Sequence, residues 1–101
     1  MIDVMDYGGG NTGSLLRALR RLDVEARLVP RGTELAGARP VVLPGVGSFG
    51  AVMEALRERG FEAAIRSVVA TGVPLLGICV GLQVLFERSE ESRTEPGFGF
   101  L

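Results

Sequence analysis

Short apolar runs alternate along this chain with longer stretches in which apolar residues recur every three or four positions. A run of three to six largely apolar residues bounded by glycine, proline or charged residues is typical of a buried β-strand. The chain has such runs at residues 2–5, 24–29, 41–43 and 74–78, of which the second alternates least cleanly. The hydrophobic pattern therefore predicts four strands.

Helical spacing fills much of the chain between and after these strands. After the first strand, four leucines share one face and three arginines the other: Leu15, Leu16, Leu19 and Leu22, against Arg17, Arg20 and Arg21. A second helical stretch covers residues 52–70 with a break near Gly60, and a third is expected from Cys79 to about Arg88. We expect a short helical turn or loop at residues 33–39 and a solvated loop at residues 89–96.

Strands that alternate with helices predict an α/β domain, in which a parallel sheet carries helices on both faces. Functional groups in such sheets collect at the carboxyl ends of the strands. Glycine-rich loops follow the first, third and fourth predicted strands, at residues 6–13, 44–50 and 77–81. We therefore expect the three loops to meet at one edge of the sheet.

Composition narrows the class of protein. The 101 residues suffice for one small domain, and 47% hydrophobic residues with a mean hydropathy of +0.31 favour a well-formed core. A net charge of −1 offers no basic footprint for nucleic acid, and no apolar run approaches the ~18 residues of a membrane span. A single cysteine and an N-terminus without signal-peptide character predict a cytoplasmic protein.

The one cysteine lies where the fourth strand is expected to turn into a helix. Gly77 and Gly81 flank Cys79, which makes the segment a cysteine version of the G-x-S-x-G nucleophile elbow. Small neighbours permit a tight turn and close approach of a substrate, and a helix start favours the thiolate form. A buried, inert cysteine explains the same spacing equally well, because free cysteine is among the most buried residue types.

The first glycine-rich loop also fits a different site. Gly8, Gly10 and Gly13 form G-x-G-x-x-G after a predicted strand, the pattern of dinucleotide-binding turns. Such sites carry an acidic residue about 20 residues further on, at the end of the second strand. The sequence has Pro30 and Arg31 there, so a nucleotide-binding domain stays an alternative with only part of its signature.

Four stretches taken together resemble the class I (triad) glutamine amidotransferases. They are DYGGGN at 6–11, LPGVGSFG at 43–50, LLGICVGLQVLFERSEE at 75–91 and the terminal GFGFL. The cysteine stretch marks the superfamily, and DYGGGN with PGVGSFG is most similar to the glutaminase subunits of imidazole glycerol phosphate synthases. The resemblance implies a flavodoxin-like three-layer fold, of which residues 1–101 form the N-terminal half of a single, incomplete domain.

The resemblance implies glutamine hydrolysis through a thioester. Cys79 would attack the side-chain carboxamide of glutamine, release ammonia, and be freed by water with release of glutamate. The backbone N–H of Val80 would be one oxyanion donor, and a peptide near Val46 and Gly47 would supply the other. No metal and no cofactor are implied.

The resemblance also implies substrate and partner contacts. Gln83 and Gly45 match positions that hold glutamine, although Gln83 is otherwise an ordinary helix-surface residue. Gly10 and Asn11 match the part that faces a TIM-barrel cyclase subunit, which receives the ammonia; a plain β–α turn explains the same two residues.

The chain departs from this family in one respect that bears on catalysis. It contains no histidine, the base that a cysteine nucleophile ordinarily needs, and it is about half the family's length. We expect the 101 residues alone to be inactive, as a fragment or a shortened relative, and to leave a sheet edge that favours self-association. A non-catalytic flavodoxin-like interaction module is therefore the main alternative to a glutaminase.

Overall fold

The computed structural model describes residues 1–8, 11–35, 37, 39–86 and 96–101, and everything below refers to these residues. Strands and helices alternate as the sequence predicts. In chain order they are β1 (Ile2–Met5), α1 (Thr12–Arg21), β2 (Ala26–Val29), the 3-10 turn η1 (Gly32–Glu34), β3 (Val41–Gly45), α2 (Phe49–Glu58), α3 (Phe61–Ala70), β4 (Leu75–Cys79) and α4 (Val80–Gln83).

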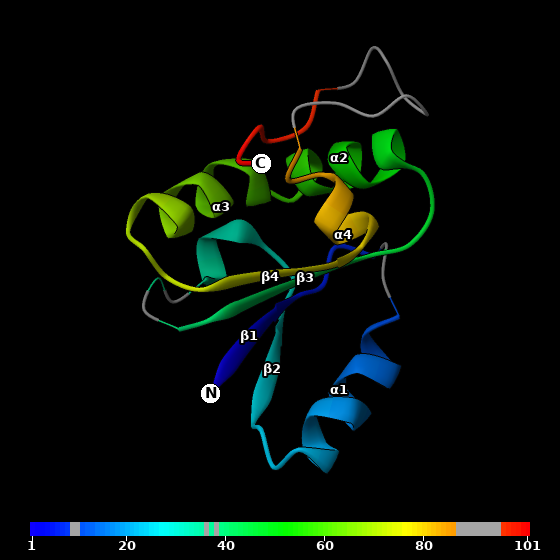
Figure 1. Cartoon of the computed structure of the whole chain (residues 1–101), viewed down its shortest axis with the longest axis vertical. Helices are drawn as coiled ribbons and strands as arrows, with labels where there is room; N and C mark the ends of the chain where they lie inside the picture. The colour runs from blue at the N-terminus through cyan, green and yellow to red at the C-terminus, as the bar shows by residue number, and fades with distance from the viewer. Residues whose placement is uncertain (9–10, 36, 38, 87–95) are drawn as a thin grey trace.

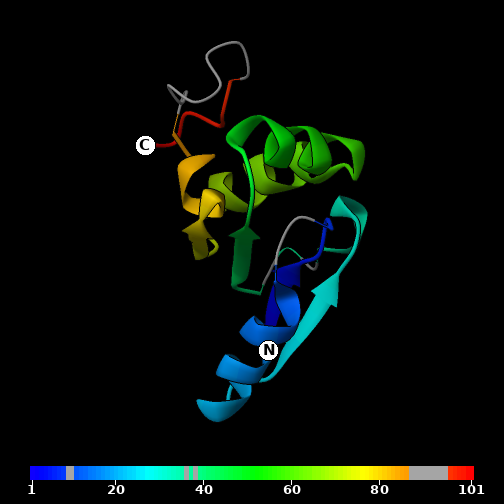
Figure 2. The same ribbon diagram turned by 90° about the vertical axis from the view of Figure 1, so that its right-hand side faces the viewer.

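The described strands form a single sheet in the order β2-β1-β3-β4, with every pairing parallel. Helix α1 lies on one side of the sheet, and α2, α3 and α4 lie on the other (Figure 1; Figure 2). The predicted α/β class, with a parallel sheet between two helical layers, is confirmed. Because all strands run the same way, their carboxyl ends share one edge, which also holds the starts of α1, α2 and α4.

The core lies between the sheet and the α2–α3 layer. Its fully buried side chains come from the strands and both helices: Met5, Val29, Leu43, Phe49, Val52, Met53, Leu56, Phe61 and Ile65. Burying one side chain of this size contributes about 1.5–3 kcal/mol, so this layer carries most of the hydrophobic stabilisation. Helix α1 makes a thinner cover, with Leu15, Leu16 and Leu19 only partly buried.

The predicted break in the second helical stretch is a complete separation into two helices. Gly60 adopts a left-handed conformation with φ of 72°, and it places α3 at a new angle after α2. The helix α2 also begins earlier than predicted, at Phe49, because the Ser48 side chain accepts a hydrogen bond from the Ala51 N–H at 3.2 Å.

The third predicted helix is much shorter than expected. Helix α4 ends at Gln83, and the predicted end at Arg88 lies outside the described residues. The carbonyls of Val84 and Leu85 instead accept bonds from the N–H groups of Phe98 and Phe100, both at 2.8 Å. The C-terminal segment therefore takes carbonyls that a longer helix would have used, and it lies next to α4 in both views (red in Figures 1 and 2).

Strand limits differ from the prediction by one or two residues. Strand β2 starts at Ala26 because the preceding residues close α1, with the Val24 N–H bonded to the Leu19 carbonyl at 2.9 Å. Strand β3 continues to Gly45 because it pairs with β4 as far as Cys79.

Candidate active site

Cys79 lies at the junction of β4 and α4, on the carboxyl edge of the sheet. Its backbone has φ of 55° and ψ of −124°, and Asp23 is the other described non-glycine residue with a positive φ. Such a conformation costs about 1–3 kcal/mol and is typical of a nucleophile elbow. The side chain is exposed, which excludes the inert buried cysteine that the sequence left open.

The glycines on either side of Cys79 are required by close packing. A Cβ on Gly81 would lie 2.0 Å from the Leu43 carbonyl oxygen, and a Cβ on Gly77 would lie 2.8 Å from the Gly81 oxygen. The start of α4 therefore rests directly on the backbones of β3 and β4. This contact is what turns the chain sharply enough to present the cysteine at the surface.

The loop after β3 begins beside this elbow. Gly45 is the Cα partner of Cys79 in the sheet, and a Cβ on Gly45 would lie 2.4 Å from the Gly81 nitrogen. Val46 and Gly47 follow as exposed residues, and Gly47 has φ of 102°. The structure thus brings the predicted oxyanion loop next to the predicted nucleophile, although the paired residues Gly45 and Cys79 are 34 positions apart in the sequence.

Val80 and Gln83 lie on the short helix that follows the cysteine. Val80 is the first residue of α4 and is partly buried, while Gln83 is its last residue and is exposed. Gln83 therefore lies one helical turn beyond Cys79, and its side chain is exposed. A residue that contacts a bound amino acid must be accessible in this way.

Tyr7 is a member of this site that sequence reasoning did not single out. It is buried in the turn after β1, and its hydroxyl donates a hydrogen bond to the Pro44 carbonyl, one residue before Gly45. Burial raises the pKa of Tyr7 to about 12, so the phenol keeps its proton throughout the neutral range. The sequence signal that could have indicated Tyr7 is that it is the single aromatic residue in the glycine-rich turn at residues 6–13.

The residues predicted to face a partner subunit lie in the turn between β1 and α1. Asn11 is exposed, and its side-chain oxygen caps α1 by accepting from the Ser14 N–H at 3.3 Å. This cap explains Asn11 without any partner. Gly10 lies outside the described residues.

In the described part of the chain, no three His, Cys, Asp or Glu side chains come together as a group able to hold a metal ion. Nor does the described part contain a helix with the length and apolar character needed to cross a membrane.

A strained, exposed cysteine at a strand-to-helix turn, beside a glycine loop on a parallel sheet, is the arrangement of a nucleophile elbow. The chain matches the family model of glutamine amidotransferase class-I over residues 3–95, and it belongs to that family. The family predicted from the motifs is therefore confirmed.

Curated relatives show which members of this family the chain resembles. The imidazole glycerol phosphate synthase subunit HisH of Streptococcus mutans is 48% identical over all 101 residues, which cover 50% of that protein. The protein of the same name from Geobacillus kaustophilus is 50% identical, with 48% of its length covered. The chain thus spans about half the length of the curated relatives it matches.

The fold comparison agrees with these relatives. A solved structure described as a glutamine amidotransferase superposes with a TM-score of 0.78 at 27% identity. The match covers 99% of this chain and 52% of that structure, so the similarity extends over the whole sheet described here.

Proposed function

We propose that this chain carries the nucleophile half of a glutaminase that supplies ammonia to imidazole glycerol phosphate synthesis. The observation that carries the proposal is the pairing of Gly45 with Cys79, which sets the Val46–Gly47 loop against an exposed cysteine in elbow geometry. The relatives named as HisH subunits support the choice of pathway.

The proposed chemistry uses the cysteine sulfur and two backbone donors. The Cys79 thiolate attacks the side-chain carbonyl carbon of glutamine, and the tetrahedral oxyanion is held by the N–H of Val80 and by the peptide between Val46 and Gly47. The C–N bond then breaks, the nitrogen leaves as ammonia after protonation, and water cleaves the thioester to give glutamate. One oxyanion donor is worth about 3–4 kcal/mol, which makes the orientation of the loop decisive.

Proton transfer requires a group that this sequence does not contain. The nitrogen must gain a proton as it leaves, and the attacking water must lose one. The 101 residues include no histidine. We therefore propose that the base comes from additional polypeptide, as the greater length of the relatives allows, and that the 101 residues alone do not turn over glutamine.

The proposal includes a heterodimer with a cyclase subunit of TIM-barrel fold, located in the cytoplasm. Gly8 and Asn11 lie between the carboxyl end of β1 and the start of α1, on the edge of the sheet that also carries Cys79. Ammonia released at Cys79 would therefore leave on the side where the partner binds.

The test measures glutamate release from glutamine in three preparations: the chain alone, the chain with a cyclase subunit, and the chain continued after Leu101 by the second half of the Geobacillus kaustophilus relative. We expect turnover only in the continued protein, with stimulation by the cyclase, and none in a Cys79→Ser control. A folded continued protein that releases no glutamate would exclude the proposal. Turnover by the chain alone would show a different proton carrier.

A non-catalytic interaction module is the second candidate, and the exposed edge of the sheet favours it. Strand β4 ends the strand order, and Leu76, its second residue, is 59% exposed. An apolar strand at a sheet edge promotes pairing with another chain. Sedimentation of the chain over a range of concentrations tests this; a monomer at high concentration would argue against self-association.

A further inference from the structure

Three elements that are distant in sequence meet at the hydroxyl of Tyr7. This hydroxyl donates to the Pro44 carbonyl and lies 3.0 Å from the point that a Cβ on Gly45 would occupy. The same point is 2.4 Å from the backbone nitrogen of Gly81, in the first turn of α4. The phenol therefore contacts the end of β3 where β3 touches the cysteine elbow.

The pairing of the strands explains why the Pro44 carbonyl needs this donor. Strands β1 and β3 pair only through Val41 and Val42, whereas β3 continues to Gly45. At Pro44, β1 has already ended, so on that side β3 has no neighbouring strand to donate to a buried carbonyl. Tyr7 follows β1 by two residues and replaces the missing backbone donor with its hydroxyl.

The residues after Pro44 are those of the proposed oxyanion loop. Gly45 is buried and paired, but Val46, Gly47 and Ser48 are exposed, and regular structure resumes only in α2. Gly47, with φ of 102°, permits peptide orientations that other residues rarely adopt. The loop is thus anchored at its two ends, at Pro44–Gly45 and at the Ser48 cap, with the exposed Val46–Gly47 peptide between them.

We propose that Tyr7 is a positioning residue, whose hydroxyl fixes the Pro44 end of the loop and thereby sets the orientation of the Val46–Gly47 peptide relative to Cys79. Tyr7 touches neither the substrate nor the reacting atoms. Its effect on catalysis rests on the glutaminase function proposed above, whereas its effect on the loop is a property of this chain alone.

The first experiment measures amide hydrogen exchange of Gly45, the buried and paired residue at the Pro44 end of the loop, in the 101-residue chain, resolved by NMR. Tyr7→Phe removes only the hydroxyl. The matched control is Thr71→Val, because the Thr71 hydroxyl also donates to backbone carbonyls, of Ser67 at 3.1 Å and Val68 at 3.0 Å, at the end of α3.

We expect Tyr7→Phe to accelerate exchange at Gly45 by about two- to tenfold, the factor that one hydrogen bond supports, and Thr71→Val to leave it unchanged. Unchanged exchange in Tyr7→Phe would overturn the proposal. Equal acceleration throughout the core strands would also overturn it, because that pattern reports a loss of global stability and not release of the loop.

The second experiment tests the catalytic consequence in the protein continued by the second half of the Geobacillus kaustophilus relative. We expect Tyr7→Phe to lower kcat about tenfold, counted per alkylatable Cys79 thiol, and to leave KM for glutamine unchanged, because the oxyanion forms only in the transition state. Unaltered kcat would overturn the catalytic part of the inference. If the unsubstituted continued protein released no glutamate, the proposed function would fail while the exchange result for Tyr7 would stand.

Discussion

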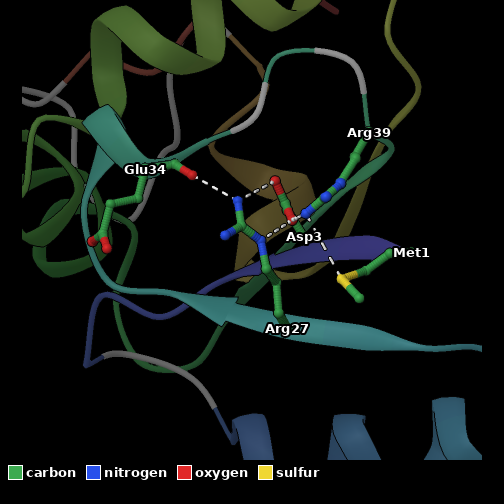
Figure 3. A network of polar contacts seen from close by, with 5 residues as sticks. All are labelled: Met1, Asp3, Arg27, Glu34 and Arg39. Atoms are coloured by element: carbon green, nitrogen blue, oxygen red, sulfur yellow. Dashed lines mark hydrogen bonds and ion pairs between the residues drawn. The ribbon is translucent and has the colours of Figure 1, made fainter.

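Arg27 donates from Nε to Oδ1 of Asp3 at 2.7 Å, and the carboxylate that it binds is fully buried (Figure 3). The same guanidinium donates from Nη2 to the Glu34 carbonyl at 2.8 Å, and Arg39 approaches the carboxylate at 3.8 Å. The hydrogen bond to Asp3 raises the pKa of Arg27. The network ties β1 to β2 and to η1, near the amino ends of the strands. The network therefore stabilises the fold, and it lies at the opposite end of the sheet from Cys79.

Because Asp3 is buried and Arg27 is partly exposed, removing Arg27 should lower the free energy of unfolding more than removing the charge of Asp3. Arg27→Met leaves a buried carboxylate without its closest cation, whereas Asp3→Asn leaves a partly exposed guanidinium that water can solvate. We expect a loss of about 1–2 kcal/mol for Asp3→Asn and a clearly larger loss for Arg27→Met, both measured by urea unfolding. Arg17→Met is the control, since the bond from Arg17 to Ser14 is exposed, and it should change stability by less than about 0.5 kcal/mol. Equal losses for Arg27→Met and Asp3→Asn would contradict this account.

Two glycines with opposite surroundings test the packing of the cysteine elbow. A Cβ on Gly81 would lie 2.0 Å from the backbone oxygen of Leu43, so Gly81→Ala must displace α4 from β3. We expect it to cost about 3 kcal/mol or more. In α1, a Cβ on Gly13 would meet only the Arg17 side chain at 3.5 Å, so Gly13→Ala should be neutral or stabilise by up to about 1 kcal/mol. Thermal unfolding of both variants measures the contrast, and a tolerated Gly81→Ala would refute the close approach.

Much of the fold followed from the hydrophobic pattern because the strands are short and bounded by strong turn residues. Strand β1 was predicted with its observed limits, and the parallel sheet followed from the alternation of strands and helices. The end of the last helix was missed because tertiary contacts decide it. The carbonyls of Val84 and Leu85 bond to a segment more than ten residues further on, and local periodicity carries no trace of that competition.

In the candidate site, the local turn was predicted from the sequence, whereas a contact between distant residues was not. The glycines around Cys79 identify a sharp turn, and the structure places a strained cysteine there. The Tyr7–Pro44 bond was not predicted, because it joins residues separated by 37 positions. A motif identifies residues that perform chemistry, but residues that position them through the backbone become evident only when the strands are paired.

Tyr7 gives the chain a stability that depends on alkaline pH. Its pKa is raised from 10.0 in the unfolded chain to about 12 in the fold, so the folded state holds this proton more tightly. The contribution is complete below pH 10, and it falls as pH rises through the interval from 10 to about 12, because the unfolded state loses the proton first. Two pKa units correspond to at most about 2–3 kcal/mol.

Tyr7 is the sole tyrosine and the sequence has no tryptophan, so absorbance near 295 nm, a phenolate band, reports this one group. We expect a phenol titration near pH 12 in the folded chain, with stability in urea falling between pH 10 and 12. In Tyr7→Phe, the fall due to this group should vanish. A phenol titration at pH 10 in the folded chain would show that burial does not shift it.

An arginine of α3 contacts both aromatic rings of the C-terminal segment. The Arg66 guanidinium lies 5.3 Å from the ring centre of Phe98 and 5.6 Å from that of Phe100, and it donates to the Phe98 carbonyl at 3.2 Å. We expect Arg66→Met to destabilise the chain by about 1–2 kcal/mol and to speed amide exchange at Phe98 and Phe100. Arg66→Lys should recover part of the cation–π attraction without the second hydrogen-bonding arm. If Arg66→Met speeded amide exchange in β1, far from this segment, as much as at Phe98 and Phe100, Arg66 would not act locally on the C-terminal segment.

The strain at Cys79 predicts that the proposed nucleophile is held in place at the expense of stability. Its φ of 55° and ψ of −124° suit glycine far better than any residue with a side chain. Cys79→Gly should therefore be more stable than Cys79→Ala, by about 1–3 kcal/mol, because only glycine relieves the strain. At an ordinary helix or strand position the order reverses, since glycine loses more backbone entropy on folding. Ala64 in α3 provides that comparison: Ala64→Gly should destabilise by about 1 kcal/mol. Urea unfolding of the four chains measures both differences. If alanine were the more stable residue at position 79, the elbow would be relaxed, and the geometry would no longer single out this cysteine as a site where stability is given up for reactivity.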